Sequence, residues 1–85
     1  MTQLEAVIIN VTPLEVGWYV DCEQNLLQVF QSGGEAERSA VRLAAAFSKV
    51  GRPATVIVHD RRGVVAGTLD VAPGYEFSRR WRTLH

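Results

Sequence analysis

The sequence predicts an α+β domain in which a single antiparallel sheet of about five strands carries one helix on one face. Three observations predict this fold. Segments rich in β-branched residues occur in both halves of the chain, one alanine-rich stretch with helical periodicity lies between them, and the resulting element order is β-β-β-α-β-β. We expect residues 1–74 to form the domain and residues 75–85 to form a basic, aromatic C-terminal tail that docks.

The first half of the chain predicts a meander of three antiparallel strands, over residues 5–11, 16–23 and 26–31. The first strand is rich in β-branched residues, and Pro13 is expected to interrupt it because proline has no N–H to donate. A turn at residues 24–25 separates the last two strands. The second strand alternates, so its side chains divide between two faces: Trp18, Val20 and Cys22 on one, and Tyr19, Asp21 and Glu23 on the other.

A single helix follows this meander and ends near Val50. Ser32 is the expected N-cap, and Glu35 three residues later completes a capping-box pattern. Gly51 suits a left-handed C-cap, and Pro53 prevents the helix from continuing. The apolar stripe is dominated by alanine, which indicates close packing of the helix on the sheet: Ala36, Ala40, Leu43, Ala44 and Phe47.

Two further strands are expected over residues 54–59 and 64–71. The first contains too many β-branched residues in succession for a helix of that length. The loop Asp60-Arg61-Arg62-Gly63 predicts a hairpin, since aspartate favours the first position of a turn and glycine the last. Gly67 is a candidate for a β-bulge in the second strand.

Charge is divided unequally along the chain although the net charge is zero. The sequence has six acidic residues and no lysine or arginine up to Glu37, then nine basic and three acidic residues from Arg38 onward. We expect the two halves to neutralise each other within one fold, with association between copies as the alternative. The single cysteine excludes an internal disulfide, and the chain has neither an apolar run of membrane-spanning length nor a recognisable signal peptide. A cytoplasmic protein is therefore expected.

Three segments resemble a family of short bacterial proteins, the domain-of-unknown-function family 2188. They are the strand Gly17-Trp18-Tyr19-Val20, the alanine-rich helix and the hairpin Val56-Ile57-Val58-His59-Asp60-Arg61-Arg62-Gly63. The resemblance covers roughly residues 5–70. It implies the same α+β fold, and it transfers no activity or catalytic residue.

The residues capable of chemistry have simpler structural interpretations, and we expect no catalytic, metal or cofactor site. Cys22 is predicted on the same face as Trp18 and Val20, as a buried thiol. His59 and Asp60 are neighbours and point to opposite sides of a strand end, so Asp60 is expected to stabilise the turn. Asp21 and Glu23 share one strand face, which we interpret as solvated. The two histidines and one cysteine lack any metal-ligand spacing.

The sequence thus predicts a non-catalytic interaction module that binds another protein or itself, with no membrane partner. The alternative is a nucleic-acid-binding domain, because arginine beside an exposed aromatic residue can contact phosphates and stack on bases. A sequence pI near 6.7 does not favour that alternative. The candidate contact residues for either partner occupy the hairpin tip and the tail: Arg61, Arg62, Arg79, Arg80, Trp81 and Arg82.

Overall fold

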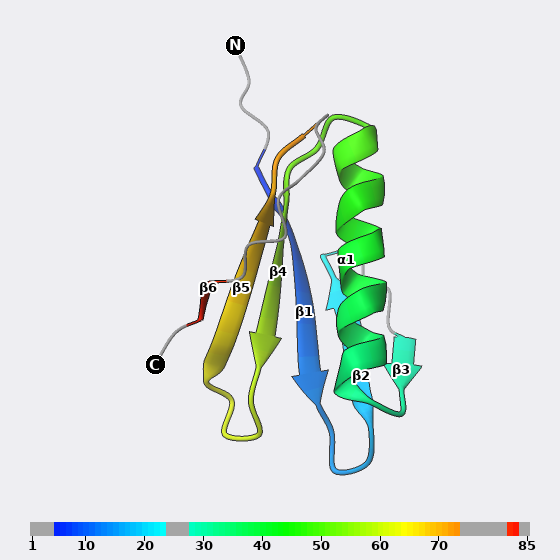
Figure 1. Ribbon diagram of the computed structural model, residues 1–85, viewed down its shortest axis with the longest axis vertical. Coiled ribbons are helices and arrows are strands. Elements are labelled where there is room, and N and C mark those ends of the chain that lie inside the picture. The colour runs from blue at the N-terminus through cyan, green and yellow to red at the C-terminus, as the bar shows by residue number, and fades with distance from the viewer. Residues whose placement is uncertain (1–4, 24–27, 74–81, 84–85) are drawn as a thin grey trace.

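A computed structural model describes residues 5–23, 28–73 and 82–83 of the chain, and these form an α+β fold (Figure 1). The single helix and the first five strands follow each other in the predicted order β-β-β-α-β-β, and a sixth, short strand follows. The elements are β1 (Val7–Pro13), β2 (Trp18–Cys22), β3 (Gln28–Phe30), α1 (Gly33–Lys49), β4 (Ala54–His59), β5 (Val65–Val71) and β6 (Arg82–Thr83).

The strands form one sheet in the order β3-β2-β1-β4-β5-β6. All neighbouring pairs are antiparallel except β1 and β4, which run parallel from Val7↔Ala54 to Val11↔Val58. The predicted antiparallel pairing therefore holds for the other neighbouring strands and is wrong only at β1–β4. The reason is the crossover: α1 returns the chain to the end of the sheet where β1 began, so β4 starts there and runs in the same direction.

The strands also differ from the prediction in their bounds, notably at the end of β1, and in an additional strand within the tail. β1 continues through Pro13, because its pairing with β4 has ended at Val11, so β1 is an edge at residue 13 and tolerates the missing N–H. β6 lies in the predicted tail, where Thr83 and Arg82 pair with Gly67 and Thr68 of β5. The register between β4 and β5 shifts at Val58/His59, close to the predicted bulge at Gly67.

The loop from β1 to β2 requires glycine at position 17. The Leu14 N–H donates to the Gly17 carbonyl at 2.9 Å, which closes the turn. Gly17 has φ +89°, and a Cβ there would lie 2.7 Å from the carbonyl oxygen of Phe30 on β3. Both the backbone conformation and the close approach of β3 exclude a larger residue.

The predicted helix ends are confirmed. The Ser32 hydroxyl accepts a hydrogen bond from the Glu35 N–H at 3.2 Å, so it caps a backbone donor that the helix itself leaves unpaired. At the other end, Gly51 adopts φ +84° and the Arg52 N–H donates to the Phe47 carbonyl at 2.9 Å. This is the left-handed C-cap that the glycine indicated.

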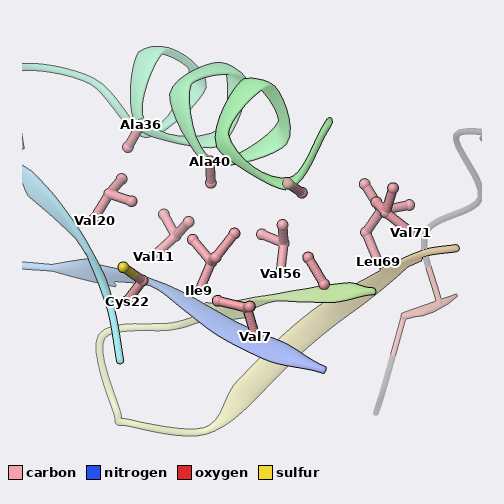
Figure 2. Close-up of a cluster of buried hydrophobic side chains, with 12 residues drawn as sticks. Val7, Ile9, Val11, Val20, Cys22, Ala36, Ala40, Val56, Leu69 and Val71 are labelled. Carbon is pink, nitrogen blue, oxygen red and sulfur yellow. The ribbon is translucent and has the colours of Figure 1, made fainter. Parts of the chain in front are cut away.

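The core lies between α1 and one face of the sheet, which we call the covered face (Figure 2). Small alanine side chains let the helix approach the strands closely, and Leu43 and Phe47 pack at the margin of the core. Ser48 is a buried polar residue in this layer, and its hydroxyl donates to the Ala72 carbonyl at 2.6 Å. In the part of the chain that the structure describes, twelve hydrophobic residues are buried: Val7, Ile9, Val11, Val20, Cys22, Ala36, Ala40, Ala44, Ala54, Val56, Leu69 and Val71.

Candidate functional site

The opposite side of the sheet, which we call the open face, is the main candidate surface. Among the described segments, only α1 packs on a face of the sheet, and it packs on the covered face (Figure 1). Side chains that alternate with the buried ones point the other way. The open face comprises Ile8, Asn10 and Thr12 of β1, Tyr19 and Asp21 of β2, Thr55, Ile57 and His59 of β4, and Thr68 and Asp70 of β5.

A chain of side-chain hydrogen bonds crosses three strands of the open face. The Asn10 amide Nδ2 donates to Asp21 Oδ1 at 3.1 Å, and Asn10 Oδ1 lies 3.1 Å from His59 Nε2. A carboxylate can only accept, so the amide nitrogen must face Asp21 and the amide oxygen must face His59. In this contact His59 therefore donates through its Nε2–H to the Asn10 amide oxygen.

A second polar contact lies at the other end of β4 and joins it to β5. The Thr55 hydroxyl of β4 donates to Asp70 Oδ1 of β5 at 3.0 Å, and the two residues are direct partners in the ladder. The polar side chains of the open face are thus bonded largely to one another. Covering such a face leaves fewer unpaired donors and acceptors than covering a face of isolated polar groups.

Two isoleucines lie among these polar groups on the central strands. Ile8 is 38% exposed, and Ile57 on β4 is half-buried. In the parallel register Ile8 stands beside Thr55, and Ile57 stands beside Asn10. The isoleucines are therefore diagonal neighbours, with Ile57 in the middle row of the open face and Ile8 in the row where β1 and β4 begin.

Arg61 and Arg62, the predicted contact residues of the hairpin tip, make bonds within the domain. Arg61 Nη1 donates to the Leu14 carbonyl at 2.9 Å, which ties the β4–β5 loop to the β1–β2 loop. Arg62 pairs with Asp60 at 3.0 Å, although its side chain remains 81% exposed. Arg61 is thus a link between two loops as well as a surface charge.

Asp60 stabilises the turn, as the sequence predicted. Its Oδ1 accepts from the N–H groups of Val64 and Arg62, at 3.0 and 2.8 Å. The Val64 N–H, followed by the Arg62 side chain and N–H, lowers the pKa of Asp60 below its usual value. Hydrogen bonds to the charged form are the physical cause.

The predicted residues of the tail are placed only in part. Arg79, Arg80 and Trp81 lie outside the described residues. Arg82 lies in β6 and pairs with Thr68, which is in the middle of β5. Arg82 is therefore away from the hairpin loop at residues 60–63.

The other candidate groups take structural roles. Cys22 is buried on the covered face, as expected. Asp21 and Glu23 do not act together, since Asp21 binds Asn10 while Glu23 forms an ion pair with Arg52 at 3.2 Å. That ion pair joins the acidic and basic halves of the sequence within one fold. Across the ranges that the structure describes, no three residues of the types His, Cys, Asp and Glu gather as a metal site.

The His59–Asn10–Asp21 chain could not be predicted from the sequence. Its members are 11 and 49 residues apart in sequence, and only the parallel register of β1 and β4 brings Asn10 within reach of His59. The alternation of side chains along β2 predicted which face Asp21 occupies. No pattern near Asp21 in the sequence predicted that it would bond to Asn10.

No protein-family model, curated protein or solved structure matches the chain. The resemblance to the domain-of-unknown-function family 2188 therefore stays a prediction. Within the described residues, no helix is both long and apolar enough to cross a membrane.

Proposed function

We propose that this domain is a non-catalytic interaction module that binds a second copy of itself through the open face of its sheet. The single observation that carries the proposal is the composition of that face. It presents Ile8 and Ile57 on its two central strands, among polar side chains that largely bond to one another. Burial of such a face removes apolar area from water without leaving most of these polar groups unpaired.

The size of the open face sets the strength of the proposed association. Four strands of up to seven residues, about 4.8 Å apart, outline about 450 Å² on each copy. A stable complex ordinarily buries about 800 Å² on each partner. We therefore propose a weak, reversible dimer that forms at high protein concentration, and not an obligate one.

Light scattering after size-exclusion chromatography, over a series of protein concentrations, tests this proposal. We expect the average mass of the wild-type chain to rise from one copy towards two. Ile8→Lys should weaken association at least about tenfold, because it places a charge in the interface. The matched control is Val16→Lys, at an 87% exposed valine in the β1–β2 loop, which should associate like the wild type. Circular dichroism verifies that both variants are folded.

A wild-type chain that stays monomeric at every concentration would contradict self-association. Nucleic-acid binding is then tested on the same sample, by titrating single- and double-stranded DNA and RNA at low salt. Binding that weakens steeply with salt would support the alternative function. This alternative has less support among the described residues, because Arg61 and Arg62 both bond within the domain.

A further inference from the structure

The strand directions in the sheet have an internal symmetry that bears on how two copies could pack. The parallel strands β1 and β4 occupy the two central positions, and each has an antiparallel strand on its outer side. The next strands outward, β3 and β6, again run antiparallel to their neighbours. The pattern of directions is therefore the same when it is read from either edge of the sheet.

We propose that the two copies are related by a two-fold axis that runs parallel to the strands, above the boundary between β1 and β4. This inference rests on the self-association proposed above. Rotation about such an axis lays β4 of the second copy over β1 of the first, with both strands running in the same direction. Sheets that pack face to face in proteins commonly keep their strand directions within about 30° of each other.

The open-face side chains of β1 and β4, the two central strands, are complementary under this rotation. The register pairs Ile8 with Thr55 and Asn10 with Ile57. After the rotation, Ile8 faces Thr55 of the second copy, and Ile57 faces Asn10 of the second copy. Each large apolar side chain therefore meets a smaller polar one, and the four isoleucines of the dimer form one compact cluster. Alternation of large and small side chains across facing positions is what lets two layers interdigitate.

The placement of charge distinguishes this axis from the alternative, a two-fold axis perpendicular to the strands. Asp21, Asn10, Ile57 and Thr68 stand side by side across β2, β1, β4 and β5. The proposed axis places Asp21 over Thr68 of the second copy, whose hydroxyl can donate to the carboxylate. An axis perpendicular to the strands through the same residues would place Asp21 over Asp21 of the second copy. Two carboxylates that face each other repel, so the parallel axis is favoured.

Chemical crosslinking measures which residues face each other. Facing sheets lie about 10 Å apart. For the proposed axis, the Cα atoms of Asp21 and Thr68 of the second copy are thus about 10 Å apart, whereas those of the two Asp21 residues are about 17 Å apart. Asp21→Cys and Thr68→Cys are prepared separately, mixed, and treated with a short bismaleimide at a concentration where the wild type dimerises. Mass spectrometry then identifies the covalent dimers.

The expected result is a crosslinked heterodimer in the mixture, and little crosslinked homodimer from either variant alone. The wild type, whose Cys22 is buried on the covered face, serves as the control for background reaction. If Thr68→Cys alone, which keeps Asp21, crosslinks as fast as the mixture, the proposed axis is wrong, while self-association stands. If the wild type is monomeric by light scattering, the proposed function itself fails. If Asp21→Cys is unfolded, Tyr19→Cys replaces it. Tyr19 lies on β2, on the same face as Asp21 and two residues before it.

Discussion

The covered and open faces of the sheet are built by alternate residues of the same strands, and different interactions stabilise them. On β1, Val7, Ile9 and Val11 are buried beneath α1, whereas Ile8, Asn10 and Thr12 point to the open face. The covered face depends on close packing against small alanines. The open face depends on hydrogen bonds between side chains, such as the His59–Asn10–Asp21 chain. Adjacent residues of one strand can therefore be changed to affect folding or association separately.

The largest expected difference between the faces comes from two adjacent isoleucines. Ile9→Ala should lower the free energy of unfolding by about 3 kcal/mol, because it leaves a cavity at a site with no exposed surface. Ile8→Ala should lower it by less than about 1 kcal/mol, since Ile8 is already 38% exposed. Urea denaturation followed by tryptophan fluorescence, at a protein concentration low enough to keep the chain monomeric, measures both values. Equal losses in the two variants would show that the open face is also covered in the folded monomer.

An intermediate effect is expected from removing the central amide of the open face. Asn10→Ala should cost about 1 kcal/mol, because it removes two partly buried hydrogen bonds. It should also release the ring of His59, so that nitrogen NMR spectra change from one proton position, on Nε2, to a mixture of both. Thr12→Ala is the matched control, since it lies on the same strand and face outside this chain of hydrogen bonds. A single Nε2–H form that persists in Asn10→Ala would disprove the proposed role of the amide.

The smallest effect is expected in the β4–β5 loop, which belongs to neither face. The folded-state pKa of Asp60 is lowered, so its stabilisation is present above the unfolded pKa, near 3.8, and is lost as pH falls through the folded value. The stability difference between wild type and Asp60→Ala should therefore shrink as pH falls from about 6 to about 2.5. Urea denaturation across this range measures it. Val16→Ala, at an exposed residue of the neighbouring loop that carries no titratable group, is the control, and its stability difference from the wild type should show no such decline.

The local features of the fold could be predicted because each depends on residues close together in sequence. The alternation of Trp18, Val20 and Cys22 fixed the inner side of β2, and Ser32 and Gly51 marked the ends of α1. Features that depend on distant pairing could not be predicted. The parallel pairing of β1 with β4 follows from the crossover through α1, and the contact between Asn10 and His59 depends on that pairing. The strand at Arg82–Thr83 follows a basic, aromatic segment whose sequence shows no strand-like alternation. The pairing of this strand with β5 could therefore not be predicted.

The central position of β1 has a consequence for how the chain folds. Among the described strands, β1 comes first in chain order yet lies in the middle of the sheet, and its second neighbour, β4, ends only at residue 59. Before β4 pairs, one edge of β1 is unpaired. The apolar side of the β1–β2–β3 meander is likewise exposed before α1 packs on it. Contacts between segments so far apart in sequence slow folding, because a long loop must close before they form. We therefore expect the parallel β1–β4 contact to form late and to limit the folding rate.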